Sequence, residues 1–152
     1  MGTYVITSLV TVDRPADEVA AYLLDWTHDV EWRAAVTRFT VEPTGRAVRG
    51  QRLVEELRYA GLTFRTPTTV AEVSPLTARY TGGGRSMRVA GVRSVVALGP
   101  DRCEVRTRTE LGPRGAMRLL APLLVGSYRR ADAADLRTLA ARFAGATSAR
   151  TS

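Results

Sequence analysis

The segment DWTHDVEW, residues 25–32, crowds together the residue types from which many catalytic sites are built. It holds the only histidine of the chain, His28, together with both tryptophans and three carboxylates. A histidine beside a carboxylate can act as a general base when a nucleophile lies within reach. The chain has no G-x-S-x-G nucleophile motif, and its only cysteine, Cys103, falls in a predicted hairpin. We therefore expect His28 to be an exposed turn or helix-capping residue.

The chain offers little with which to hold a metal or a cofactor. A single cysteine excludes an internal disulfide and a cysteine-based zinc site, and a single histidine excludes a histidine-rich site. The glycine-rich segment GGGR, residues 82–85, lacks the lysine and the following serine or threonine of a P-loop. We expect neither a metal nor a cofactor.

A second set of chemically useful residues lies on a predicted strand with the sequence QRLVEELRY. Alternation places Leu53, Glu55, Leu57 and Tyr59 on one face. If that face points into an apolar interior, desolvation would raise the pKa of Glu55 and suit it to general acid or base work. The opposite register would send Glu55 into water and leave Glu56 inside. Glu55 and Tyr59 are the candidate catalytic residues, and periodicity alone leaves the register open.

Other side chains on predicted inward faces could contact a bound molecule. Hydroxyl groups among them could donate to a ligand carbonyl, although core residues with satisfied hydroxyls would show the same pattern. Arg85 and Arg88 flank the glycine-rich segment and could attract an acidic ligand to an entrance. The candidate ligand-binding residues are Trp32, Phe39, Leu57, Phe64, Thr66, Thr68, Tyr80, Ser94, Thr107, Leu124 and Tyr128.

Strands and helices must position these residues. Apolar residues recur mainly with the period of two typical of strands in the first part of the chain and with helical spacing in the last third. Alternation predicts a first strand over 4–12. Pro15, followed by two acidic residues, marks the start of a helix that should end near Asp25 or Trp26. A short second helix or turn is expected over 29–35.

The remainder of the chain divides into strands and one long helix. About six strands are expected from residue 37 to residue 111, with turns at glycine-rich points. Helical spacing over 117–143 predicts a long helix, which Pro122 should bend or begin. Residues 145–152 have nothing to bury and are expected to be a disordered tail. The order strand, two short helices, strands, long helix is an α+β arrangement.

The turn sequence GPDR predicts a hairpin between the last two strands. Pairing Leu98 with Cys103 would place Val96 opposite Val105 and Ser94 opposite Thr107, which forms an apolar inner face. The other face would then be solvated. The residues expected there are Glu104, Arg106, Arg108 and Glu110, and Arg79 and Arg93 are likewise expected to point outward.

Composition favours one soluble domain over a nucleic-acid-binding or membrane protein. The 152 residues are 45% apolar and 24% charged, and the net charge of +7 comes from 22 arginines and no lysine. The arginines are dispersed and often alternate with apolar residues, which argues against a nucleic-acid site. No apolar run is long enough for a bilayer span, and the N-terminus lacks the basic region of a signal peptide. We expect a cytoplasmic protein, either a monomer or a homodimer paired at the edge of its first strand.

An ordered set of short motifs supports a family resemblance. The pattern V-x-x-P-x-x-x-V-x-x-x-L-x-D, followed by a tryptophan, is matched from Val12 to Asp25 and at Trp32. E-V-S-P at 72–75, L-G-P-D at 98–101 and a terminal L-x-x-L at 136–139 follow in order. The chain thus resembles the START-like superfamily, also called the polyketide cyclase/dehydrase and lipid transport group.

The resemblance implies a helix-grip fold, in which a curved antiparallel sheet of about seven strands wraps a long C-terminal helix around an apolar cavity. It covers roughly residues 4–143, so we expect a single domain over 1–144. Members of the superfamily bind hydrophobic ligands, carry lipids or quinones, or guide cyclisation, aromatisation or dehydration of polyketides. We expect binding of such a ligand, either with cyclase or dehydratase activity or as a non-catalytic carrier or sensor, and as a minor alternative RNA or acidic-partner binding through surface arginines.

One departure concerns the aromatising cyclases of this superfamily, which are associated with an interior arginine on a middle strand. The corresponding strand here carries Thr66 and Thr68 on its predicted inner face, whereas Arg65 falls on the outer face. The resemblance therefore supports a ligand cavity more strongly than aromatase activity.

Overall fold

The computed structural model describes residues 2–59 and 61–151 as a sheet of seven strands with one long and several short helices. This is the α+β helix-grip arrangement that the sequence predicts. The elements are β1 (Tyr4–Val12), α1 (Ala16–Leu23), the 3-10 helix η1 (Trp26–His28), α2 (Asp29–Trp32), β2 (Val36–Glu42), β3 (Arg52–Tyr59), β4 (Leu62–Ser74), β5 (Thr77–Gly83), β6 (Met87–Gly99), β7 (Arg102–Pro113) and α3 (Met117–Thr151).

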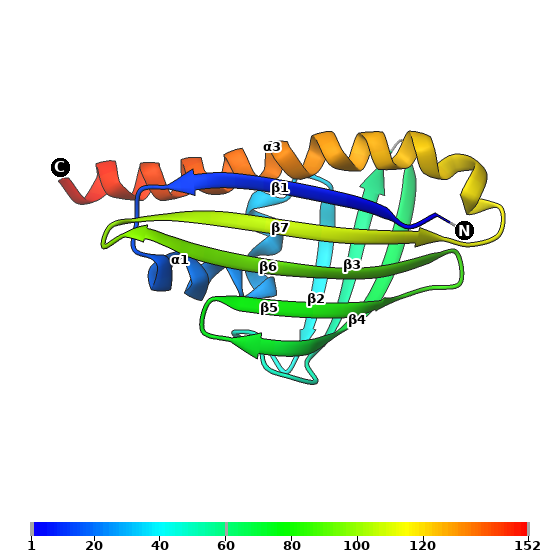
Figure 1. Cartoon of the computed structure of the whole chain (residues 1–152), viewed down its shortest axis with the longest axis horizontal. Helices are drawn as coiled ribbons and strands as arrows, with labels where there is room; N and C mark the ends of the chain where they lie inside the picture. Colours follow the sequence, from blue (N-terminus) through cyan, green and yellow to red (C-terminus); the bar gives the residue numbers. More distant parts are fainter. Residues whose placement is uncertain (1, 60, 152) are drawn as a thin grey trace.

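The sheet is antiparallel and strongly curved. Its strand order is β1-β7-β6-β5-β4-β3-β2, so every neighbouring pair except β1 and β7 is also consecutive in sequence. In Figure 1, β1, β7, β6 and β5 run nearly horizontally, whereas β2, β3 and β4 cross behind them at a steep angle. The curvature leaves an inner face that the helices cover, with α3 lying along β1 (Figure 1).

The short helices after β1 follow from local sequence signals. α1 begins directly after Pro15 and carries two acidic residues in its first turn, where they complement the helix dipole. It ends at Leu23, slightly earlier than predicted, because Asp25 begins a new element. The carboxylate of Asp25 accepts a hydrogen bond from the backbone N–H of Thr27 at 3.0 Å, which caps η1.

Helix α3 packs one apolar face on the sheet. Val125, Leu136 and Leu139 are buried on it, as their helical spacing predicts. Pro122 lies inside the helix, which begins five residues earlier at Met117. The helix runs to Thr151 and so includes most of the segment for which the sequence predicts disorder.

The register of the β6–β7 hairpin differs from the prediction by one residue. Ala97, not Leu98, pairs with Cys103, because the register shifts between Ala97 and Gly99. Such a bulge leaves one residue unpaired and exchanges the two faces of the strand that follows. Val95 therefore opposes Val105 and is buried. Arg93, predicted to be solvated, points inward and is 5% exposed.

No helix in the described ranges is long and apolar enough to cross a membrane.

Candidate functional site

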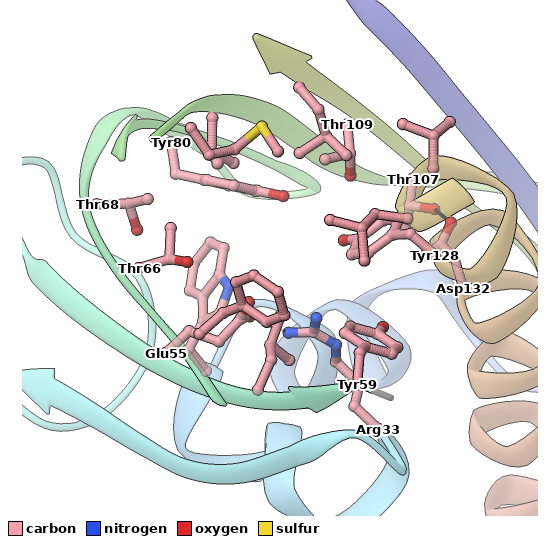
Figure 2. A pocket seen from close by; sticks show the side chains of 18 of the residues that line it. Arg33, Glu55, Tyr59, Thr66, Thr68, Tyr80, Thr107, Thr109, Tyr128 and Asp132 are labelled. Carbon is pink, nitrogen blue, oxygen red and sulfur yellow. Dashed lines mark hydrogen bonds and ion pairs between the residues drawn. The ribbon is translucent and has the colours of Figure 1, made fainter. Parts of the chain in front are cut away.

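The inner face of the curved sheet, the first turns of α3 and the end of α2 enclose a cavity (Figure 2). In Figure 2, Arg33, Glu55 and Tyr59 lie along one side of it, and Tyr80 and Thr109 lie along the other. The lining residues are Trp26, Trp32, Arg33, Glu55, Leu57, Tyr59, Phe64, Thr66, Thr68, Tyr80, Met87, Val89, Arg93, Thr107, Thr109, Leu111, Met117, Leu124, Val125, Tyr128 and Asp132.

The structure brings most of the predicted site residues to this cavity. β3 turns Glu55, Leu57 and Tyr59 inward, which settles the register that periodicity left open. Both candidate catalytic residues therefore face the cavity. The other predicted residues found in its lining are Trp32, Phe64, Thr66, Thr68, Tyr80, Thr107, Leu124 and Tyr128.

Four predicted residues lie outside the cavity lining. Ser94 is on the outer face of β6, in a shallow depression with Arg106 and Arg108, because the bulge shifts the hairpin register. Phe39 packs against the main core instead. Arg85 and Arg88 are exposed on the β5–β6 hairpin.

Behind the cavity-lining Arg33 and Arg93 lies a fully buried carboxylate, that of Asp29 at the start of α2, which does not itself line the cavity. Its side chain is 0% exposed. It accepts a hydrogen bond from Arg93 Nη1 at 2.8 Å and a second from the other Arg93 terminal nitrogen. Arg33 Nη1, one helical turn further along, donates to the same carboxylate at 2.9 Å. Two buried guanidinium groups therefore share one buried carboxylate, an arrangement that is stable only with this close pairing.

The second negative charge of this network comes from Glu55. Arg33 Nη1 donates to Glu55 Oε2, so the cation bridges the buried Asp29 and the cavity-facing carboxylate. Burial lowers the pKa of Arg33, but the adjacent carboxylates of Glu55 and Asp29 outweigh it and hold the pKa well above the ordinary value. Glu55 thus faces the cavity, as one of the two predicted registers requires, and its carboxylate is ion-paired with Arg33.

The two tryptophans pack on the other arginine of the network. The Arg93 guanidinium carbon lies 4.9 Å from the ring centroid of Trp26 and 5.2 Å from that of Trp32. Cation–π contact of this kind stabilises a desolvated guanidinium. Arg93 also donates to the carbonyl oxygen of Leu23 at 3.1 Å. Trp32, a candidate ligand-binding residue, therefore packs on a buried cation and also forms part of the cavity wall.

Three tyrosines place phenol groups in the cavity wall. Burial raises the pKa of Tyr59 to about 12 and raises the pKa of Tyr80 and Tyr128 as well. These phenols are therefore protonated near neutral pH and can donate hydrogen bonds. The rings of Tyr59 and Tyr128 lie 6.3 Å apart, centroid to centroid. Tyr80 lies across Gly91, the residue with which it pairs in β6.

Polar residues of α3 attach the helix to the rest of the site. Asp132 Oδ2 accepts a hydrogen bond from the Thr107 hydroxyl at 3.1 Å. Asp135 Oδ1 accepts one from the backbone N–H of Ala34, just after Arg33, at 3.1 Å. Burial raises the pKa of Asp135. These contacts fix α3 against β7 and against the segment that carries Arg33.

His28 belongs to a separate cluster near the C-terminal half of α3. Its ring stacks on Tyr22 with centroids 4.3 Å apart, and its Nδ1 lies 3.4 Å from Glu31 Oε2. Arg142 Nη2 lies 3.6 Å from the same carboxylate oxygen. His28 stands at the N-cap position of α2, as the prediction of a turn or capping residue allows, but its side chain is 34% exposed and makes no capping hydrogen bond among the described residues. It links α1 and α2 and is not part of the cavity lining.

Sequence reasoning missed the charged residues on which the site is built. Asp29 and Arg33 are an i, i+4 pair, a spacing that itself signals an ion pair on a helix. Arg93 is a single charge within the apolar run VAGVRSVVAL, which could have marked it as buried. Asp132 and Asp135 alternate with alanines on α3, and no local pattern distinguishes them from surface residues.

The arrangement suits organic acid–base chemistry and hydrogen bonding better than metal binding. Within residues 2–59 and 61–151, no group of three or more histidine, cysteine, aspartate or glutamate side chains is placed to hold a metal ion. The cavity instead combines apolar and aromatic walls with a few convergent polar groups, the usual composition of a small-molecule site.

A seven-stranded antiparallel sheet that grips a long C-terminal helix is the fold of the START-like class. The model of the family described as polyketide cyclase / dehydrase and lipid transport matches residues 4–142. The chain therefore belongs to this family. No curated protein sequence matches it significantly.

Solved structures of the same fold are distant in sequence. The Zhui aromatase/cyclase from Streptomyces sp. R1128 is 16% identical, with 93% of this chain and 94% of that chain covered and a TM-score of 0.75. A START superfamily protein from Mycobacterium smegmatis is also 16% identical, with coverages of 95% and 99% and a TM-score of 0.72. Norcoclaurine synthase from Thalictrum flavum is 18% identical, with coverages of 91% and 87% and a TM-score of 0.60. At these identities the likeness shows the fold.

Proposed function

We propose that this protein binds a hydrophobic, oxygen-bearing molecule of polyketide-like or aromatic type and catalyses its cyclisation or dehydration. Family membership implies a hydrophobic ligand. The observation that carries the proposal is the Arg33–Glu55 pair in the cavity lining, backed by the fully buried Asp29. Desolvating these charges is costly. A carrier of a purely apolar molecule would have no use for a carboxylate and a guanidinium group in the lining of its cavity.

Several donors converge on the space that a ligand would occupy. The protonated phenols of Tyr59 and Tyr128 can donate to a ligand oxygen. The buried Trp32 Nε1 has no hydrogen-bond acceptor among the described residues, and Trp32 lines the cavity. A ligand carbonyl or phenol oxygen would satisfy such a donor. These groups would orient the ligand with its oxygen end toward Arg33.

In the proposed reaction, Glu55 removes a proton from the carbon next to a ligand carbonyl, most readily from a methylene between two carbonyls. The electron pair moves into an enolate, whose oxygen charge Arg33 and a phenol stabilise. The enolate carbon forms a carbon–carbon bond to a second carbonyl carbon of the same ligand, and that oxygen takes the proton from Glu55. Loss of the new hydroxyl with a neighbouring proton releases water and forms a double bond.

The test is catalysed exchange of an activated methylene in heavy water. A small aromatic 1,3-diketone serves as the probe, and NMR follows loss of its methylene proton signal. The wild-type protein should accelerate exchange well beyond buffer, and Glu55→Gln should return the rate to near background while the diketone still binds. Glu56→Gln is the matched control, because Glu56 lies on the opposite face of β3. Unaccelerated exchange by wild type, with tight binding, would support carriage without chemistry and refute the enzyme proposal.

A further inference from the structure

The first turns of α3 expose leucines on the side of the helix that faces away from the sheet. Leu119, Leu120 and Leu123 are 86%, 49% and 73% exposed. Ala121 and Val125 in the same turns are buried, so this part of the helix is apolar on both its inner and outer sides. In Figure 1 it lies where β7 ends and the chain turns back into α3.

Exposed arginines lie close to these leucines in the chain and on the adjoining hairpin. Arg114 and Arg118 lie on the approach to α3 and in its first turn, and both are exposed. The β5–β6 hairpin, with exposed Arg85 and Arg88, is adjacent, because the backbone N–H of Arg114 donates to the carbonyl oxygen of Ser86 at 2.9 Å.

No acidic residue offsets these positive charges in the neighbouring sequence. None occurs between Glu110 and Asp132 or between Glu72 and Asp101. We call the three leucines together with Arg85, Arg88, Arg114 and Arg118 the leucine–arginine face.

We propose that the leucine–arginine face docks this protein on the surface of an anionic lipid bilayer. Leucines projecting from a convex helix can enter the boundary between headgroups and acyl chains, while guanidinium groups bind the phosphates. A contiguous exposed apolar patch of this kind usually marks an interaction site. The large exposed fractions of Leu119 and Leu123 suit insertion into a deformable lipid layer better than contact with a rigid protein partner.

Docking in this way would bring the cavity close to the lipid. Met117 and Leu124, from the same turns of α3, line the cavity. A hydrophobic molecule dissolved in the bilayer would therefore have a short path to the site. The docking proposal does not depend on the reaction proposed above, since it rests on the outer side of α3.

Vesicle co-sedimentation tests the proposal. The probes are vesicles of phosphatidylcholine alone and of phosphatidylcholine with about 30% phosphatidylglycerol, at low and high salt. Wild-type protein should sediment with the anionic vesicles, and high salt should weaken binding. Leu119→Gln/Leu123→Gln should lower the partition coefficient at least about tenfold. Arg114→Gln/Arg118→Gln should lower it about 25-fold, since each surface arginine contributes about fivefold.

Two exposed residues elsewhere provide matched controls. Leu9→Gln, on β1 at 65% exposure, and Arg52→Gln, on β3, should leave vesicle binding unchanged. Wild-type protein that stays in the supernatant with both vesicles would overturn the proposal. So would light scattering that shows a dimer which Leu119→Gln/Leu123→Gln converts to a monomer, because the leucines would then serve self-association. If a column of immobilised acidic protein retained the wild-type protein while neither kind of vesicle bound it, the leucine–arginine face would bind a protein partner. That result would also refute the proposal.

Discussion

Asp29 should be the single most important charged residue for the stability of this fold. Its carboxylate is completely buried and accepts hydrogen bonds from both Arg33 and Arg93. The substitution Asp29→Asn keeps the size of the side chain but removes the charge. Two buried guanidinium groups would then face one remaining carboxylate, that of Glu55. Removing one partner of a buried ion pair typically costs about 3–5 kcal/mol, because it leaves an uncompensated charge.

The assay is thermal and urea unfolding of wild type and variant at neutral pH, followed by circular dichroism. For a domain of this size, each kcal/mol shifts the Tm by about 2–4 °C, so Asp29→Asn should lower it by roughly 6–20 °C. The control Asp101→Asn changes an exposed aspartate in the β6–β7 turn and should stay within about 0.5 kcal/mol of wild type.

A double variant separates lost pairing from lost packing. Adding Arg93→Met to Asp29→Asn removes one of the unpaired cations, so the combined loss should be smaller than the sum of the two single losses by at least about 1 kcal/mol. If Asp29→Asn lowers the Tm by less than about 2 °C with an unchanged urea m-value, the Asp29 carboxylate does not neutralise the two buried arginines.

Two further predictions concern packing and pH. Gly91→Ala would place a Cβ 2.3 Å from the Tyr80 hydroxyl oxygen, so Tyr80 must move out of its place in the cavity wall. We expect a loss of about 1–3 kcal/mol in urea unfolding, whereas Gly99→Ala, with open space around it, should be neutral. Asp135 has a pKa raised by burial, so it contributes stability that is present below pH 3.8 and is lost as the pH rises through its folded-state pKa. The stability of Asp135→Asn relative to wild type should therefore increase with pH above 3.8 and then level off, and a relative stability that stays flat or falls over that range would contradict the assignment.

Local patterns in the sequence predicted most of the fold. β1 has the predicted bounds because its alternation is uninterrupted. Alternation also gave the two possible faces of β3, but only the packing of the sheet decides that Glu55 points inward. The β6–β7 register failed because a bulge near Leu98 adds one residue, and neither composition nor periodicity marks where a bulge falls. That single residue exchanged the predicted positions of Arg93 and Ser94.

The sequence predicted most of the apolar and hydroxyl residues of the cavity wall and one of its charged residues, Glu55, but not Asp29, Arg33 or Arg93. Glu55 and Tyr59 could be found because they share a strand face with apolar residues. Asp29 and Arg93 are 64 residues apart and meet only when the short helices pack on the inner face of the sheet. His28 is the rarest residue type in the segment DWTHDVEW, yet the fully buried charge of that segment is that of Asp29. A rare residue type in a sequence therefore indicates a functional site less reliably than the ion-pair partners that the fold brings to a charged residue.

The most direct test of the central claim is to locate a bound ligand by NMR. We propose that an oxygen-bearing ligand occupies the cavity with its polar end at Arg33 and within reach of the Trp32 indole N–H, which has no acceptor among the described residues. With the two tryptophan indole signals assigned through Trp26→Phe and Trp32→Phe, an aromatic 1,3-diketone should shift the Trp32 indole signal of wild type, and Arg33→Gln should weaken that titration at least about tenfold. A diketone that binds without moving the Trp32 signal, or that binds Arg33→Gln as tightly as wild type, would contradict the account.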